Sequence, residues 1–404
     1  MDRTDELLDM MALTKVHGMG LNHARELVDA LGSASAVMEH RHDIRAVLPD
    51  ASERLHFALS SSQVEEARQR AEVEMAFMDK HHIRAISVMD AAYPQRLLDC
   101  PDSPLVLYAM GNILPAKADD DFDKPLFLSE QPARYGSFQH DQAFNRPHVI
   151  NMVGTRRCTE YGRDLCRNLV HELAELAPDI LVVSGLAYGI DVNAHRAALN
   201  EGMDTVGVLA HGLDTIYPAA HRGLAAKMLE QGGLLTEYMS GTNPDKGNFV
   251  RRNRIVAGMC DATVVVESAA KGGSLITATI AHSYGRDVFA FPGRAYDPYS
   301  AGCHKLIQTG KAGLICHADD LLNALGWDNI GKKDTSRQLD IDFELTDEEE
   351  LIVNVLKEQD EVQINQLVVA TGMDYSHVTS LLFELEMKGI IKVLGGARYR
   401  LIQR

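Results

Sequence analysis

The feature of this sequence that most constrains its fold is a series of short apolar runs that alternate with amphipathic stretches. The stretch from Tyr161 to Leu176 shows the amphipathic pattern, since its apolar residues share one face of a helix, and Pro178 ends it. Continuous apolar strands alternating with such helices are typical of a parallel sheet covered on both faces. The predicted strands are 149–153, 180–184, 205–210, 234–238, 262–267 and 287–291. We therefore expect an α/β fold with a doubly wound parallel sheet.

Small, hydroxylated and basic residues follow several of these predicted strands. They occur after the first strand (154–157), the second (184–191) and the fifth (271–278). Ligands of such sheets bind beyond the carboxyl ends of the strands, and small residues that open helices present free backbone N–H groups to an anion. The candidate binding residues at these strand ends are Arg156, Arg157, Ser184, Gly185, Lys271 and Ser274.

A basic segment, KGNFVRRNR (246–254), follows the fourth strand and contains four positive charges, no acid and one aromatic residue. Basic residues around an aromatic ring suit a single nucleic-acid strand, because the charges attract phosphates and the ring stacks on a base. Its candidate residues are Lys246, Phe249, Arg251, Arg252, Asn253 and Arg254. Taken singly, a glycine turn is a tight connection, a basic run is a solvated helix face and a Phe is a core residue. Their convergence at one sheet edge favours a phosphate-rich ligand.

The composition is that of an ordinary globular protein. The chain has 404 residues, of which 46% are hydrophobic and 24% charged, and its net charge is -17. That charge argues against wholesale coating of nucleic acid but does not exclude a local basic groove. No apolar run approaches the roughly 20 residues that span a bilayer. The six cysteines form no C-x-x-C pair, so we expect reduced thiols in a cytoplasmic protein.

Other site chemistries lack support in the sequence. There is no P-loop motif, no G-x-G-x-x-G after the first strand and no G-x-S-x-G nucleophile elbow. Cys303-His304 and Cys316-His317 do not have the spacing of a common zinc site. The acidic cluster 119–123 is interpreted as a solvated loop rather than a cation site. We therefore predict no catalytic residue, no metal and no cofactor.

The sequence pattern indicates three domains. Residues 1–80 show helical periodicity only, residues 82–327 carry the strand–helix alternation, and residues 345–404 return to helices before two short strand-like runs. The polar segment from Asp328 to Glu344 is interpreted as a linker. The segment 114–146 is interpreted as a loop or insertion, and its role stays open.

Six motifs in this order make the sequence similar to the DNA-processing protein A (DprA/Smf) family. They are VGTRRCTEYG, SGLAYGIDVNAH, YPAAHRGL, NFVRRNRIVAG, KGGSLITATIA and VFAFPGR, within a core of about residues 90–325. The resemblance implies an extended Rossmann-like domain that binds single-stranded DNA, protects incoming DNA during natural transformation and loads the RecA recombinase. It also implies a homodimer, which we place around Leu306, Ile307 and Leu314. The positions that match the family's motifs are Arg156, Ser184, Gly185, Lys246, Phe249, Arg252, Arg254, Lys271 and Ser274.

The flanking regions resemble known modules less specifically. Residues 16–33 resemble a helix-hairpin-helix, read either as a donor of backbone N–H groups to DNA phosphates or as a packing module without DNA contact. The tail from Thr346 resembles a winged helix. Its presumed recognition helix, Tyr375 to Lys388, carries Glu384 and Glu386, a poor complement to a phosphate backbone. We therefore favour a protein-contact or regulatory role for the tail.

Three functions compete on the sequence alone. The first is a non-enzymatic mediator that binds single-stranded DNA. The alternative is a nucleoside-phosphate-processing enzyme of a related Rossmann-like fold, but such enzymes pair a Gly-Gly loop with a nearby catalytic Glu, and 274–281 contains no acid. A winged-helix transcription regulator with a ligand-sensing core is weakened by the acidic recognition helix.

Overall fold

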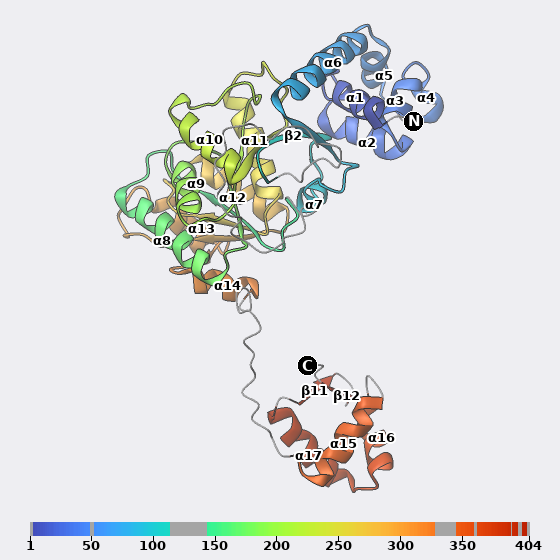
Figure 1. Ribbon diagram of the computed structural model, residues 1–404, viewed down its shortest axis with the longest axis vertical. Helices are drawn as coiled ribbons and strands as arrows, with labels where there is room; N and C mark the ends of the chain where they lie inside the picture. Colours follow the sequence, from blue (N-terminus) through green and yellow to red (C-terminus); the bar gives the residue numbers. More distant parts are fainter. Residues whose placement is uncertain are drawn as a thin grey trace, which may run out of the picture. The chain divides into compact units, whose positions relative to one another are not determined.

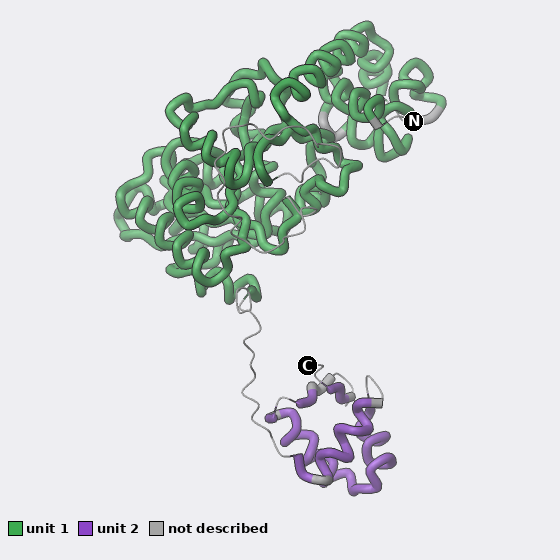
Figure 2. Tube along the Cα trace, in the orientation of Figure 1, with its two compact units in different colours: residues 1–331 green, residues 332–404 purple. Residues whose placement is uncertain are grey.

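The structure, a computed structural model, falls into two compact units, residues 1–331 and 332–404 (Figure 2). Its described residues are 3–48, 52–113, 144–327, 345–358, 362–388, 390–394 and 398–401. The predicted linker (328–344) and residues 114–143 of the predicted insertion lie outside them. The domain boundaries predicted near residues 80, 327 and 345 stay predictions.

The described part of the first unit is built on a nine-stranded sheet in the order β1-β2-β6-β5-β4-β3-β7-β8-β9. Strands β3 to β9 all pair with one another in parallel, which confirms the predicted parallel sheet. The antiparallel strands β1 and β2 extend it beyond β6 and were not predicted. The strands are β1 (Arg84–Ser87), β2 (Val106–Met110), β3 (Val149–Val153), β4 (Leu181–Ser184), β5 (Thr205–Val208), β6 (Gly232–Thr236), β7 (Ala262–Val265), β8 (Asp287–Ala290) and β9 (Gly313–Leu314).

The path of the chain through this sheet creates a crevice at one edge. From β3 the chain proceeds outward through β4, β5 and β6, and then crosses to the other side of β3 to form β7, β8 and β9. The connections therefore diverge beyond the carboxyl ends of β3 and β7. In open parallel sheets this reversal of strand order is where ligands bind.

Helices cover both faces of the sheet (Figure 1). Strand side chains alternate between the faces, so Ile150 and Met152 pack with α8, α9 and α14, whereas Val149 and Val153 pack with α7, α11, α12 and α13. The helices are α7 (Gln95–Leu98), α8 (Glu160–Leu176), α9 (Ile190–Asn200), α10 (Arg222–Glu230), α11 (Lys246–Gly258), α12 (Gly273–Ser283), α13 (Ala301–Gln308) and α14 (Ala318–Leu325). The helix predicted from Tyr161 is confirmed as α8.

The N-terminal helices form a second core in the same unit. They gather at the end of the unit that carries β2 (Figure 1). Their apolar side chains pack on one another, on β2 and on the buried Met239. The hairpin predicted in 16–33 turns between α1 and α2, where Gly18 has a φ of 88°. The helices are α1 (Arg3–Leu13), α2 (Leu21–Leu31), α3 (Ala34–Glu39), α4 (Ile44–Val47), α5 (Glu53–Ser60) and α6 (Gln63–His81).

The second unit has the elements of a winged helix. Helix α15 begins with a capping box, in which the Glu349 N–H donates to Thr346 Oγ1 over 3.3 Å and the Thr346 N–H donates to Glu349 Oε2 over 3.0 Å. The antiparallel strands β11 and β12 form the predicted wing. The elements are α15 (Asp347–Glu358), β10 (Val362–Gln363), α16 (Ile364–Thr371), α17 (Tyr375–Met387), β11 (Ile391–Leu394) and β12 (Arg398–Leu401).

Two further features concern the cysteines and the length of the apolar helices. All six cysteines are free thiols. In the described part of the chain, no helix is both long enough and apolar enough to cross a membrane.

Two leucines of α8 allow a matched test of the packing. Leu173 is fully buried against the sheet, whereas Leu176, three residues later, is 37% exposed. We expect Leu173→Ala to lower the free energy of unfolding by about 2–5 kcal/mol, because it leaves a cavity. Leu176→Ala should cost less than about 1 kcal/mol. Urea denaturation of the two variants measures the difference, and equal losses would contradict the assigned burial of α8.

Candidate functional site

A pocket of about 330 Å³ opens at the carboxyl ends of β3 and β7, in the crevice where the strand order reverses. Its walls come from the loops after β3, β4 and β7 and from one side of α11. This volume lies at the small end of the range for ligand pockets, about 300–1,000 Å³. The pocket also lies where open parallel sheets bind ligands, at the reversal of strand order.

The N-terminus of α12 forms one wall of the pocket. Gly272 occupies the N-cap position and provides no side-chain hydrogen bond to the first turn, and Gly272, Gly273 and Ser274 line the pocket. The Ser274 hydroxyl donates to Ser268 Oγ over 2.9 Å, which ties the start of α12 to the first part of the loop after β7. An uncapped helix N-terminus attracts anions through its N–H groups and its dipole.

A buried arginine, Arg252, forms the floor of the pocket and is only 4% exposed. Its Nη1 donates to the carbonyl oxygens of Gly185, over 2.7 Å, and Val208. A Cβ on Gly185 would lie 2.5 Å from Arg252 Nη2, so the glycine leaves room for the guanidinium. Arg252 thus joins α11 to the loops after β4 and β5. Burial lowers the pKa of Arg252, but a guanidinium remains charged at neutral pH.

One acidic residue, Asp191, lines the pocket at the start of α9. It is 8% exposed; burial raises the pKa of its carboxyl, while the charge of Arg252 opposes that rise. The backbone of Ala187 and Gly185 also acts to lower the pKa of this carboxyl. Asp191 therefore places a buried negative charge near Arg252, at the start of α9.

Five cations around the pocket are exposed to solvent. Among the residues that the structure describes, none of the five makes an ion pair. They come from three separate loops or helices of the same sheet edge, so their positive potentials add at this site. These cations are Arg156, Arg157, Lys246, Arg251 and Lys271.

A half-buried aromatic ring, Phe249, lies beside these cations. The guanidinium carbon of Arg156 is 5.1 Å from the centre of the Phe249 ring, and that of Arg252 is 6.0 Å from it. The ring of Tyr217, which is 47% exposed, lies 5.8 Å from Phe249 at an interplanar angle of 53°. The two rings form an aromatic platform at the rim of the site, and one arginine covers part of it.

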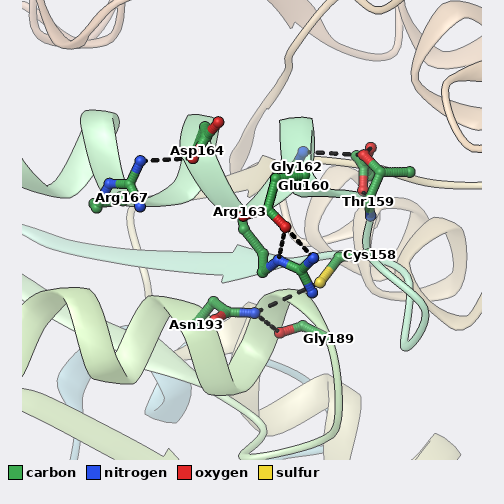
Figure 3. A network of polar contacts seen from close by, with 10 residues as sticks. Cys158, Thr159, Glu160, Gly162, Arg163, Asp164, Arg167, Gly189 and Asn193 are labelled. Carbon is green, nitrogen blue, oxygen red and sulfur yellow. Dashed lines mark hydrogen bonds and ion pairs between the residues drawn. The ribbon is translucent and has the colours of Figure 1, made fainter.

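The cations of α8, in contrast, are paired on their own helix. Figure 3 shows Arg163 bonded to Glu160 and Arg167 bonded to Asp164. The same view shows Asn193 donating to the carbonyl of Gly189 over 2.8 Å and contacting the sulfur of Cys158. These contacts fix the loop between β3 and α8 against the start of α9, without adding unpaired charge to the site.

The structure brings most of the predicted residues together at one edge. The pocket is lined by Arg156, Gly185, Arg252, Asn253, Lys271 and Ser274. Lys246, Phe249 and Arg251 lie on α11, the helix that contributes Arg252 and Asn253 to the lining, and Arg157 is exposed in the loop after β3.

Two predicted residues lie outside this group. The buried Ser184 hydroxyl donates to the Met152 carbonyl over 2.7 Å. Arg254 is 9% exposed, binds the carboxylate of Glu237 and lies 4.0 Å from Asp102. Their side chains therefore have protein partners.

Sequence reasoning missed two residues of the site, Asp191 and Tyr217. Asp191 stands in the motif after the second strand, and its nearness to Arg252 depends on the folded sheet. Tyr217 follows the third strand with Pro218, to which it is joined by a cis peptide bond. Its place at a strand end was the available signal, but only the structure sets it beside Phe249.

The second unit offers no comparable positive surface on its presumed recognition helix. On α17, the exposed residues include Glu384 and Glu386. Lys388, just beyond this helix, donates to both carboxylate oxygens of Glu349, at 2.5 and 2.7 Å. The cation near this helix is thus already paired within the unit.

Two family descriptions match this chain. Residues 134–326 match DNA recombination-mediator protein A, and residues 340–397 match the DprA winged helix domain. The first range contains the pocket and all five exposed cations.

Named relatives extend the match over most of the chain. A Mycobacterium tuberculosis protein that carries the DprA name is 36% identical over 313 residues, covering 76% of this chain and 71% of the relative. The Escherichia coli protein Smf is 35% identical over 289 residues, covering 70% of this chain and 73% of the relative.

A solved structure shares the fold. The crystal structure of DNA processing protein A from Streptococcus pneumoniae is 28% identical, with a TM-score of 0.54, and the match covers 76% of this chain and 98% of that one. Because it matches the DprA winged helix domain and relatives at 35–36% identity over more than two thirds of their length, this chain belongs to the DNA-processing protein A (DprA/Smf) family.

Proposed function

We propose that this protein is a non-enzymatic mediator that binds single-stranded DNA at the carboxyl edge of its sheet. In this proposal it protects incoming DNA, loads the RecA recombinase during natural transformation, acts as a homodimer and works in the cytoplasm. The family description as a DNA recombination mediator supports the general role. RecA loading, transformation, dimerisation and location are finer parts of the proposal.

The observation that carries the proposal is the combination of unpaired cations with an aromatic platform. The five exposed cations provide charge for several phosphates, and Phe249 with Tyr217 provides ring faces. Proteins that bind single strands without sequence preference combine these two elements. The N-terminus of α12 adds backbone N–H donors for one phosphate.

The buried arginines have a different place in this proposal. Arg252 shapes the floor of the pocket, and Arg254 holds α11 through Glu237. We assign contact with phosphates to the exposed Arg156, Arg157, Lys246, Arg251 and Lys271. Arg252, Arg254 and Ser184 support the surface that these cations form.

The alternative, a nucleoside-phosphate-processing enzyme, has less support. Such an enzyme needs a group that activates water or a leaving group beside the bound phosphate. The acid that lines the pocket, Asp191, is buried, and the charge of Arg252 acts to lower the pKa of its carboxyl. A nucleotide-release assay tests this alternative: turnover of any nucleoside phosphate that is lost in Asp191→Asn would favour the enzyme.

The first test compares single- and double-stranded DNA of the same length in a gel-shift titration. We expect tighter binding of the single strand and little dependence on its sequence, because only an unpaired strand exposes its bases to the platform. The same protein should increase the rate at which RecA filaments form on the strand. Equal or tighter binding to the duplex would overturn the proposed mode of binding.

Variants separate the contribution of charge from that of stacking. Arg156→Ala and Lys246→Ala should weaken binding to every sequence and each reduce the slope of log affinity against log salt by about 1. Phe249→Ala should cost about 1–3 kcal/mol of binding free energy and leave that slope nearly unchanged. Affinities measured at several salt concentrations give both quantities.

Two controls accompany these variants. Arg167→Ala removes an exposed cation that is paired on α8 with Asp164, so it should leave the affinity unchanged. Melting temperatures show whether Phe249→Ala unfolds the protein, since a fully buried Phe would cost about 3–5 kcal/mol of stability. Strong destabilisation with normal affinity per folded molecule would assign Phe249 to the core.

Dimerisation is proposed at the β9 edge of the sheet. In the described part of the unit, β9 has a hydrogen-bonded neighbour on one side, β8, and its Leu314 is 53% exposed. An edge strand with an exposed apolar side chain is a template for pairing with another copy. Of the other two residues predicted there, Leu306 is buried in the core and Ile307 is half-buried. The proposal therefore rests on Leu314.

Light scattering at micromolar concentration tests the dimer. We expect a mass of about twice 44.5 kDa for the wild type and about 44.5 kDa for Leu314→Asp, because a charge at the centre of the contact opposes pairing. Leu176→Asp, on the exposed side of α8, should stay dimeric. A wild type that remains monomeric would rule out self-association in this range.

A further inference from the structure

The segment that precedes the basic helix is held by the N-terminal helices. Residues 237–245 connect β6 to α11, which begins at Lys246. The side chain of Asp245 caps this helix by accepting from the Asn248 N–H over 2.7 Å. The position of the connecting segment therefore sets where Lys246 and the first turn of α11 lie.

Helix α6 contacts this segment through an ion pair whose carboxylate is buried. Glu74 is 2% exposed and pairs with Arg70, with Nη2 of the arginine 2.9 Å from Glu74 Oε2. The Ser240 N–H donates to Glu74 Oε1 over 2.9 Å, and the Ser240 hydroxyl donates to Glu74 Oε2. Arg70 Nη2 in turn donates to the Ser240 carbonyl over 2.6 Å. The pair thus engages the backbone N–H, the carbonyl and the hydroxyl of one residue.

Two neighbouring residues of the segment are fixed as well. Met239 is fully buried in the core of the N-terminal helices. The Gly241 N–H donates to Asp214 Oδ1 over 3.0 Å, in the loop after β5 that leads to Tyr217. Ser240 therefore lies at a junction between the N-terminal helices, the loop that carries Tyr217 and the start of α11.

We propose that Glu74 is a positioning residue for DNA binding: with Arg70 it holds Ser240 and thereby places Lys246 and the start of α11. This inference rests on the proposed binding of single-stranded DNA. It gives the N-terminal helices a role in binding that requires no contact with DNA. A buried carboxylate is suited to this role because a misplaced backbone leaves its charge and its hydrogen bonds unsatisfied.

The test compares Glu74→Gln with Glu72→Gln. Both residues lie on α6, and each substitution removes one negative charge, but the side chain of Glu72 is exposed. We expect Glu74→Gln to weaken binding to single-stranded DNA by about fivefold or more, in the range of couplings between separate sites. It should also lower the salt slope, because Lys246 no longer reaches its phosphate. Glu72→Gln should bind as the wild type does.

A double-mutant cycle separates positioning from general destabilisation. If Glu74 acts through the start of α11, then Glu74→Gln should have little further effect once Lys246→Ala is present. Its full effect should persist beside Lys271→Ala, because Lys271 lies in the loop after β7. Equal effects in both backgrounds would overturn the inference, as would wild-type affinity in Glu74→Gln.

Amide hydrogen exchange tests the positioning without DNA. Residues 241–248 should exchange faster in Glu74→Gln than in Glu72→Gln, and unchanged exchange would contradict the inference. If the wild type fails to bind single-stranded DNA, the proposed function fails, and exchange still decides whether Glu74 holds the segment. Should Glu74→Gln not fold, Ser240→Ala removes only one hydroxyl of the same junction and takes its place in every measurement.

Discussion

The site depends on one buried cation. Arg252 comes from α11, and its guanidinium binds the carbonyl groups that end β4 and β5. These carbonyl groups are satisfied by accepting from Arg252, and the buried Asp191 provides a negative charge near the guanidinium. The exposed surface can therefore carry cations alone, and the basic helix is locked to the sheet that orients it.

The same arrangement explains how an acidic chain can present a basic site. The net charge is -17, yet the five exposed cations near the pocket make no ion pair within the described residues. Elsewhere, as on α8, cations are paired with acids of the same helix. Because a bulk charge is screened within about 10 Å at 0.1 M salt, the local cluster determines what a phosphate encounters. The net charge of the whole chain therefore does not indicate the charge at this edge of the sheet.

The central sheet could be predicted from the sequence because its strands are short, apolar and separated by helices with one buried face. Strands β1 and β2 escaped prediction since antiparallel pairing at a sheet end depends on partners distant in the chain, such as β6. The strand-end residues could be predicted because their place relative to the sheet follows from topology. The burial of Arg252 could not be predicted, because its neighbour Arg251 is the same type of residue and is exposed. Helical phase relative to the sheet distinguishes the two, and that phase is set by packing.

In the proposed binding of single-stranded DNA, the arginine that covers Phe249 affects how a base would stack on that ring. Without DNA, the guanidinium of Arg156 already lies 5.1 Å from the centre of the ring. A base that stacks on that ring face displaces the cation, so stacking there is an exchange of one contact for another and its net gain is their difference. In this proposal, the displaced arginine would be released close to the backbone of the same strand. A single nucleotide would then contact both partners, its base the ring of Phe249 and its phosphate the guanidinium of Arg156.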